Sequence, residues 1–292
     1  MRFRAMAKIN LALDVLGKRP DGYHDVRMIM QTISMYDTLT IEKKPEPGIS
    51  LSVNLPFVPT DERNLVYRAA KLLMDEFRVE EGVRMNLAKF IPVAAGMAGG
   101  SSDAAAALVG VNRIFSLGLS TQELMERGLT IGADVPYCVM RGTALAEGIG
   151  EKLTRLPDAP DCFVLIGKPG ISVSTRQAYE SLDLSSLGER PDIDGMMRSI
   201  EAGDLYGMAD RMCNVFEPGI SGRFPVIRSI RDLMEENGAL KAVMSGSGPT
   251  VFGIFDDREK MKKAADVLKH SGMAKTVYGT ALFRPGRKEG HQ

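Results

Sequence analysis

The chain has 292 residues, and its 37 lysine and arginine residues balance 37 aspartate and glutamate residues. Binding to nucleic acid or to an anionic membrane surface needs a basic field, so neither partner is expected for a chain without net charge. The chain has three widely spaced cysteines, Cys138, Cys162 and Cys213, which argues against a framework of disulfides or a structural zinc site and favours free thiols. No apolar run approaches the ~20 residues of a membrane span. Both features favour a cytoplasmic protein.

Strand and helix patterns alternate in the first half of the chain. Residues 2–15 carry apolar side chains at alternate positions, which predicts a strand with Lys8 and Asn10 on its other face. Asn64 is predicted to cap a helix over residues 65–77, and Ser120 to Glu123 form a capping box that opens another helix. Further strands are predicted at residues 38–42, 49–53, 83–88, 137–140 and 143–146.

Residues 156–161 contain two prolines and three charged or small residues, which is typical of a linker. Because one hydrophobic core stops growing near this chain length, we expect two domains, residues 1–157 and residues 158–292. Helices are predicted at residues 175–181, 193–202, 205–213, 225–236 and 259–269. Strands are predicted at residues 162–166, 242–244, 251–255, 274–277 and 280–283. This mixture indicates an α+β fold, with a disordered tail from residue 284.

A glycine-rich turn at residues 92–102 runs directly into a run of alanines. Glycines 96, 99 and 100 permit positive φ, and Ser101 or Ser102 is expected to cap the helix that follows. The first N–H groups of that helix favour an anion, so we expect a phosphate-binding loop. No lysine follows Gly100 and the G-x-G-x-x-G spacing is missing, which excludes a Walker A motif and a dinucleotide-binding turn. A glycine-rich helix start without a ligand is the simpler alternative.

Three separated segments resemble, in order and content, the motifs of the GHMP small-molecule kinases. They are residues 7–11 (Ala-Lys-Ile-Asn-Leu), the turn at 92–102 and residues 245–250 (Ser-Gly-Ser-Gly-Pro-Thr). The resemblance implies an α+β fold with an N-terminal domain like ribosomal protein S5, a ferredoxin-like C-terminal domain and an active site between them. It also implies ATP and Mg²⁺ as cofactors.

Residues 19–24 (Arg-Pro-Asp-Gly-Tyr-His), 132–136 (Gly-Ala-Asp-Val-Pro) and 146–151 (Ala-Glu-Gly-Ile-Gly-Glu) resemble one branch of that superfamily. The resemblance implies a small-molecule substrate with a cytidine diphosphate group. It also implies ATP-dependent phosphorylation of the 2-hydroxyl of a cytidine-diphosphate-linked methylerythritol, in the non-mevalonate route to isoprenoid precursors.

By this resemblance, Asp134 accepts or orients the proton of the attacking hydroxyl, and Lys8 pairs with Asp134 and holds the reacting groups in line. Phosphoryl transfer needs chiefly positioning and charge stabilisation, which a lysine and a carboxylate supply. The simpler alternatives are a solvated lysine on an edge strand and a carboxylate that serves only the turn before Val135 and Pro136.

The resemblance also assigns binding residues. The ATP-binding residues are Pro92, Val93, Ala94, Ala95, Gly96, Met97, Ala98, Gly99, Gly100, Ser101, Ser102 and Asp103, with Asn64 and Lys89 on the adenine side. The substrate-binding residues are Asn10, Tyr23, His24, Tyr179, Ser245, Gly246, Ser247 and Gly248. Tyr23, His24 and Tyr179 are expected to hold the cytosine ring, and the alternative for Tyr179 is packing in the core. The alternative for Asn64 is a role as a helix cap only. The alternative for Lys89 is a solvated charge at the end of a strand.

Three other functions stay open at this point. One is a GHMP kinase for homoserine, mevalonate or a sugar, against which the Asp-Gly-Tyr-His segment argues. Another is a nucleotide-binding protein without catalysis, which would have lost Lys8 or Asp134. The third is a nucleic-acid-binding module, disfavoured by the charge balance. Residues 214–218 (Asn-Val-Phe-Glu-Pro) resemble a family segment without assigned chemistry, and the sequence leaves the oligomeric state and the metal ligands undefined.

Overall fold

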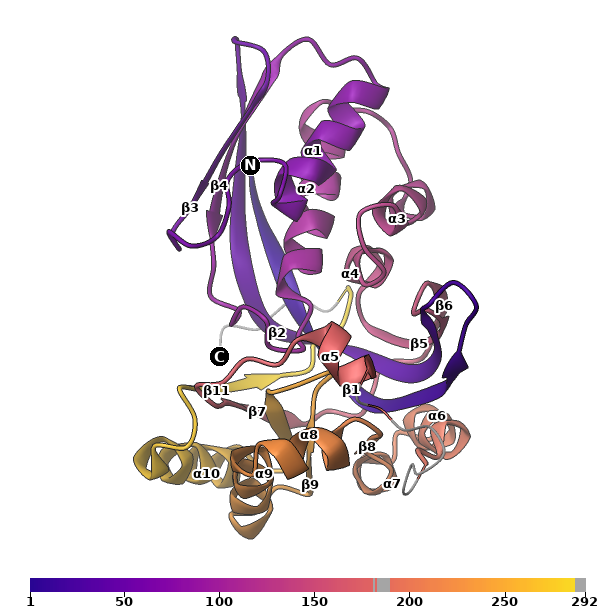
Figure 1. Ribbon diagram of the computed structural model, residues 1–292, viewed down its shortest axis with the longest axis vertical. Coiled ribbons are helices and arrows are strands. Elements are labelled where there is room, and N and C mark those ends of the chain that lie inside the picture. The colour runs from indigo at the N-terminus through magenta and orange to yellow at the C-terminus, as the bar shows by residue number, and fades with distance from the viewer. Residues whose placement is uncertain (181, 183–189, 287–292) are drawn as a thin grey trace. The chain divides into compact units, whose positions relative to one another are not determined.

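The computed structural model describes residues 1–180, 182 and 190–286, and its helices and sheets confirm the α+β class (Figure 1). The described chain forms two compact units that interleave along the sequence. Unit 1 contains residues 1–7, 35–93 and 98–140, and unit 2 contains residues 8–34, 94–97 and everything from residue 141 onward. The sequence predicts two domains with a single boundary between residues 157 and 158, and that boundary remains a prediction.

Two long strands, β1 (Arg2–Lys18) and β2 (His24–Lys44), contribute residues to both units. In unit 1, β4 (Gly82–Ala88) pairs antiparallel with the C-terminal part of β2, and β3 (Ile49–Val53) pairs parallel with β4. The predicted strand at residues 38–42 is therefore only the end of a strand that begins at His24, because the Asp-Gly turn just before it lets the chain reverse early.

The helices of unit 1 are α1 (Leu65–Glu76), α2 (Gly99–Ile114), α3 (Thr121–Leu129) and α4 (Val135–Met140). Asn64 caps α1 by accepting a hydrogen bond from the Val66 N–H at 2.9 Å, and the capping box of α3 is present, as predicted. The strand predicted at residues 137–140 is wrong, since these residues form α4. Pro136 stands in the first turn of that helix, where its fixed φ favours helical backbone.

In unit 2, β5 (Thr143–Gly148) pairs with β2, and β6 (Lys152–Arg155) pairs with β5. The short strand β8 (Cys213–Asn214) pairs parallel with β1 at Ala12 and Leu13. A separate antiparallel sheet has the order β11-β7-β10-β9. Its strands are β7 (Phe163–Lys168), β9 (Lys241–Met244), β10 (Val251–Phe255) and β11 (Thr276–Ala281). The two strands predicted at residues 274–277 and 280–283 are thus one strand.

Helices α9 (Val226–Glu236) and α10 (Arg258–Ser271) pack on this antiparallel sheet, both on the same side in Figure 1. The remaining helices of unit 2 are α5 (Thr175–Glu180), α6 (Ile193–Glu201), α7 (Leu205–Asp210) and α8 (Glu217–Arg223). Helix α8 was not predicted, because two glycines and a proline in seven residues hide its pattern. Ser181 and the last six residues of the predicted tail lie outside the described residues, whereas Arg284 pairs with Asp161 at 3.1 Å.

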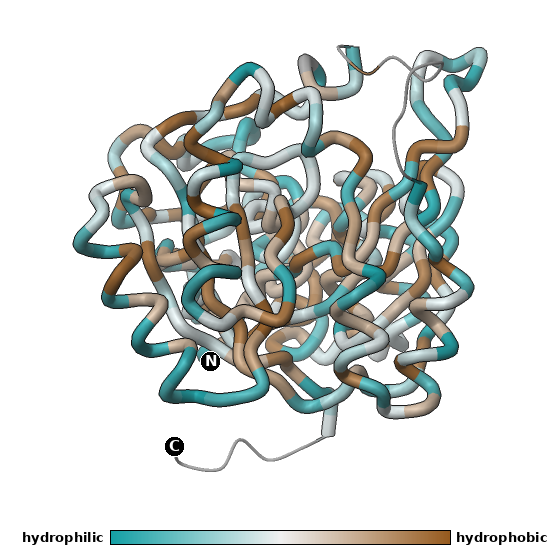
Figure 2. The backbone as a smooth tube through the Cα atoms, turned by 90° about the horizontal axis from the view of Figure 1, so that it is seen from below, coloured by the Kyte–Doolittle hydropathy of each residue, from teal (hydrophilic) through white to brown (hydrophobic). Residues whose placement is uncertain are grey.

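Polar and apolar residues alternate at short intervals along the backbone, as the colouring of Figure 2 shows. Of the helices in the described ranges, none is both long and apolar enough to cross a membrane. Cys138, Cys162 and Cys213, all described, form no disulfide, as predicted. Burial, followed by the charge of Asp161, raises the pKa of Cys162 to about 12, which keeps this thiol protonated.

Candidate active site

The glycine-rich turn leads into α2, which begins at Gly99, three residues earlier than a cap at Ser101 would allow. Ala98 occupies the cap position in left-handed backbone, at φ 52°, and neither serine caps the helix. Ser102 instead donates a hydrogen bond to the Met6 carbonyl at 2.6 Å. Of glycines 96, 99 and 100, only Gly96 uses the positive φ that glycine permits.

At Gly96, in unit 2, the glycine-rich turn contacts the glycine-rich segment that begins at Ser245. A Cβ atom at this position would lie 2.1 Å from the Ser245 carbonyl oxygen, so no other residue fits without displacement of the backbone. The Gly96 carbonyl accepts hydrogen bonds from Lys8 Nζ at 3.2 Å and from Ser245 Oγ at 2.9 Å. The second and third sequence motifs therefore meet at one peptide group.

Lys8 and Asn10 lie on the same face of β1, as the alternation predicts. Lys8 is only 5% exposed, and its Nζ donates to Asn10 Oδ1 at 2.6 Å. Backbone pairing of the Lys8 N–H with the Met97 carbonyl adds a contact to the glycine-rich turn. The alternative of a solvated lysine on an edge strand is thus wrong. The ammonium group is fixed among neutral oxygen acceptors, which leaves its positive charge for a ligand.

The third motif forms a tight turn after β9. Ser245 and Thr250 are joined by a backbone hydrogen bond, and Gly246 and Gly248 both have positive φ. The hydroxyl groups of Ser247 and Thr175 lie 3.0 Å apart, which ties the turn to the start of α5.

Asn214 and Glu217, to which the sequence assigned no chemistry, hold this turn in place. The buried Asn214 side chain donates to the carbonyls of Met244 and Gly246, at 2.7 and 2.8 Å, and accepts from the Phe216 N–H. Glu217 accepts from the Met244 N–H at 2.7 Å. The only signal in the sequence was the family resemblance of residues 214–218, because an isolated asparagine does not reveal which distant carbonyls it reaches.

Two of the residues predicted to hold the cytosine ring are in contact. The rings of His24 and Tyr179 lie 5.0 Å apart, and Tyr179 also packs edge-on against Phe216 at 4.7 Å. Tyr23 is 61% exposed, so its ring is open to solvent. Burial, then the charge of Lys18, lowers the pKa of His24, which keeps this imidazole neutral at pH 7 and able both to donate and to accept a hydrogen bond.

Asp134 directly precedes α4 in unit 1 and is half-buried. Its carbonyl accepts from the Cys138 N–H at 3.1 Å, which starts the hydrogen bonding of that helix. Lys8 belongs to unit 2. The pairing of the two side chains stays a prediction.

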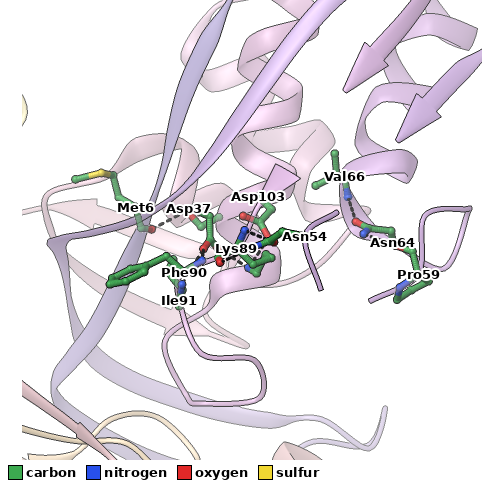
Figure 3. A network of polar contacts seen from close by, with 11 residues as sticks. Met6, Asp37, Asn54, Pro59, Asn64, Val66, Lys89, Phe90, Ile91 and Asp103 are labelled. Carbon is green, nitrogen blue, oxygen red and sulfur yellow. Dashed lines mark hydrogen bonds and ion pairs between the residues drawn. The ribbon is translucent and has the colours of Figure 1, made fainter. Parts of the chain in front are cut away.

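Lys89 and Asn64 are both occupied within unit 1 (Figure 3). Lys89 Nζ pairs with Asp37 and, at 2.6 Å, with Asp103, and its backbone bonds to the Asn54 side chain. Asn64 donates to the Pro59 carbonyl while it caps α1. Both side chains thus have structural partners, and their contact with adenine remains a prediction.

We tested whether the residues around the glycine-rich turn fit a magnesium ion. Among the described residues, no group of three or more acidic, histidine or cysteine side chains is placed to bind a metal. Asp103, the acidic residue nearest the turn in sequence, is buried against Lys89. The described residues around the turn thus offer no metal-binding group of their own, and magnesium stays a prediction.

Two family models match the chain. One, described as the GHMP kinases N terminal domain, matches residues 64–142, and the other, described as GHMP kinases C terminal, matches residues 196–273. A protein of Lachnospira eligens named 4-diphosphocytidyl-2-C-methyl-D-erythritol kinase is 53% identical, over 98% of this chain and 99% of its own length. A protein of Caldicellulosiruptor bescii with the same name is 52% identical, over 92% of this chain and 94% of its own.

Solved structures show the same similarity. A 4-(cytidine 5'-diphospho)-2C-methyl-D-erythritol kinase matches with a TM-score of 0.84 and 29% identity, over 97% of this chain and all of the other. A homoserine kinase from Cytophaga hutchinsonii matches with a TM-score of 0.73 at 17% identity, over 94% and 93% of the two chains. The second match shows a shared fold only.

Proposed function

The chain belongs to the GHMP kinases and, within them, to the 4-diphosphocytidyl-2-C-methyl-D-erythritol kinases, and we propose how its own residues carry out that family's reaction. The enzyme transfers the γ-phosphoryl group of ATP to the 2-hydroxyl of 4-diphosphocytidyl-2-C-methyl-D-erythritol, giving the 2-phosphate and ADP, in the non-mevalonate route to isoprenoid precursors. The observation that carries the assignment of residues is the meeting of three sequence motifs around Lys8 and the Gly96 carbonyl.

Lys8 supplies a fixed positive charge. Because its ammonium is bonded to two neutral oxygen atoms, those of Asn10 and Gly96, it keeps its full attraction for an anionic group. The transferring phosphoryl group carries dispersed negative charge in its loose transition state. A buried and preorganised cation stabilises that charge without reorganisation when the reaction occurs.

Asp134 accepts or orients the proton of the 2-hydroxyl. Asp134, in the turn before α4, is a half-buried residue, which allows access by the substrate. General base catalysis of this kind contributes typically about 10²- to 10⁴-fold to a rate.

The substrates are recognised by separate parts of the site. The N–H groups at the start of α2 and the turn at residues 92–102 hold the β- and γ-phosphates of ATP. Mg²⁺ bound with ATP would neutralise part of the charge on these phosphates. Tyr23, His24 and Tyr179 hold the cytosine ring, with the neutral imidazole reading its polar edge, and the turn at Ser245 to Gly248 faces the diphosphate of the substrate. We place the enzyme in the cytoplasm, without a nucleic-acid partner.

The test is ADP release by the purified protein with Mg²⁺-ATP and 4-diphosphocytidyl-2-C-methyl-D-erythritol, with homoserine and mevalonate in parallel. We expect turnover of the cytidyl compound alone and a loss of about 10²- to 10⁴-fold in kcat for Asp134→Asn, with little change in KM. Asp75→Asn, an exposed carboxylate on α1, is the matched control. An Asp134 variant that changes only KM would contradict the catalytic role, and equal turnover of homoserine would contradict the substrate.

A further inference from the structure

A buried cluster of three ionisable side chains in unit 1 is not used by the proposed mechanism (Figure 3). Lys89 contacts both Asp37 and Asp103, and these side chains are 5%, 0% and 4% exposed. Burial of a charged group costs free energy unless the group is paired and hydrogen-bonded, so the partners of these three side chains decide whether the cluster is stable.

The cluster joins the two ends of the glycine-rich turn. Asp37, on β2, accepts hydrogen bonds from the backbone N–H groups of Phe90 and, at 2.7 Å, of Ile91, which immediately precede the turn. Asp103 lies in α2, one residue after the turn ends, and accepts from Lys89 Nζ at 2.6 Å. One ammonium group therefore connects the residues that enter the turn with the helix that leaves it.

The cluster holds one cation and two carboxyl groups, whose environments differ. Asp37 receives hydrogen bonds from two backbone N–H groups and from Lys89. Asp103 receives one from Lys89, and its buried Oδ1 atom has no hydrogen-bond partner among the described residues. A second buried negative charge at Asp103 would be uncompensated.

Burial and the neighbouring carboxyl group both favour the protonated form of Asp103. Burial raises the pKa of Asp103 well above its ordinary value; Lys89 opposes this, and the neighbouring Asp37 reinforces it. Burial lowers the pKa of Lys89, but its carboxyl partners Asp103 and Asp37 raise it by more, so the lysine stays charged. Of the helices packed against α2, α1 and α3 bury no ionisable side chains, and α4 buries Tyr137 and Cys138, a phenol and a thiol.

We propose that Asp37, Lys89 and Asp103 form an electrically neutral clamp that fixes both ends of the phosphate-binding turn, with Asp103 as its protonated member. Lys89 and Asp103 act as positioning residues for ATP, through the turn between them. The clamp rests on the proposed function in one respect only, namely that residues 92–102 bind the phosphates of ATP.

The protonation state has a direct spectroscopic test that needs no activity. A protonated carboxyl group has a carbonyl stretch separate from that of a carboxylate. We expect the infrared difference spectrum of the protein at pH 7 minus Asp103→Asn to contain that band, and the spectrum of the protein minus Asp75→Asn to lack it. A carboxylate band alone in the Asp103 difference would overturn the assignment of the proton.

Positioning is tested with the double variant Lys89→Met and Asp37→Asn, which removes the salt bridge but leaves no unpaired charge and keeps an oxygen to accept from Ile91. We expect kcat/KM for ATP to fall by about tenfold to a hundredfold, because a small displacement of a positioning group has effects of this size, while KM for the cytidyl substrate changes by no more than about twofold. The control replaces the exposed pair Lys43 and Glu81 by Met and Gln, and should match the unmodified enzyme.

If the double variant does not fold, Asp103→Ala is measured instead. This variant removes only the connection to α2 and leaves Lys89 paired with Asp37. We expect the same fall in kcat/KM for ATP. Calorimetric titration with ATP separates this clamp from the proposed function. If the unmodified protein binds ATP but releases no ADP, the proposed function fails, and a matching loss of ATP affinity in the variant still supports the clamp. A folded variant with unchanged ATP affinity, or an unmodified protein that does not bind ATP, overturns it.

Discussion

The two glycine-rich turns of this protein are held by different chemistry. The turn at residues 92–102 is anchored in unit 1 by ionisable groups, Lys89 between Asp37 and Asp103. The turn at residues 245–250 is anchored in unit 2 largely by a neutral amide, Asn214, which bonds to two carbonyl groups and one N–H group. In our proposal the first anchor includes a carboxyl group that keeps its proton, whereas the hydrogen bonds of the Asn214 amide involve no ionisable side chain.

Because the two anchors use different chemistry, they should respond differently to substitution. An asparagine side chain offers donors and an acceptor at once, so a single residue satisfies a turn with mixed polarity. Hydrogen bonds between charged groups are stronger, but removal of one charged partner leaves the other buried without compensation, which is destabilising. We therefore expect the charged anchor to be sensitive to pH and the amide anchor to be sensitive only to loss of its hydrogen bonds.

The largest effect is expected where the second and third motifs touch. Gly96→Ala would place a methyl group 2.1 Å from the Ser245 carbonyl oxygen, at a φ of 71°. We expect a loss of about 3–4 kcal/mol in the free energy of unfolding, from steric overlap and backbone strain together. Urea denaturation measures it, with Gly219→Ala as control, because a methyl group there has no neighbour within 4 Å. A Gly96 variant as stable as the control would show that the contact between the turns is loose.

The amide anchor is tested by Asn214→Ala. The change leaves the carbonyls of Met244 and Gly246 and the Phe216 N–H without this partner, at about 2–3 kcal/mol in the free energy of unfolding. We also expect a higher KM for the cytidyl substrate, measured by ADP release, since the turn faces that substrate in our proposal. Asn237→Ala removes one hydrogen bond, to the Leu233 carbonyl, and should cost about 1 kcal/mol. Equal losses in the two variants would argue against a special role for Asn214.

The charged anchor is tested by the pH dependence of stability. Because the pKa of Asp103 is raised in the folded protein, its contribution to stability is complete below about pH 4, where the unfolded chain also holds the proton, and is lost as the pH rises through the folded pKa. From pH 5 upward, we expect the unfolding free energy of the unmodified protein to fall relative to Asp103→Asn by up to about 1.4 kcal/mol per pH unit. Parallel curves from urea denaturation at pH 5, 6 and 7 would show that Asp103 is ionised when folded.

The smallest effect is expected for Ser245→Ala. The Gly96 carbonyl loses its bond from Ser245 Oγ but keeps the one from Lys8. We expect a loss of about 1 kcal/mol in the free energy of unfolding and a modest fall in kcat. Ser229→Ala, which removes an exposed hydroxyl at 3.3 Å from the Pro225 carbonyl, should change neither quantity measurably in the same denaturation and ADP-release assays. A loss above about 3 kcal/mol for Ser245→Ala would mean that this hydroxyl holds the turn by itself.

Local patterns predicted most elements correctly. The alternation in β1 and the caps at Asn64 and Ser120 depend only on neighbouring residues, and the structure confirms them. The errors fall where distant contacts compete with local preference. Ser102 was expected to cap α2, but its hydroxyl bonds to the Met6 carbonyl of β1. Residues 137–140 read as a strand because a short apolar run fits either structure.

The order and content of the three motifs can be read from short stretches of sequence, and the family resemblance that they carry implied the candidate roles of Lys8 and Asp134. Only the tertiary structure decided that Lys8 and Ser245 share the Gly96 carbonyl, that Asn214 holds the third motif, and that Lys89 points into a buried cluster with Asp37 and Asp103. The physical reason is that burial and hydrogen-bond partners are set by residues far apart in the chain, and no local pattern encodes which of them meet.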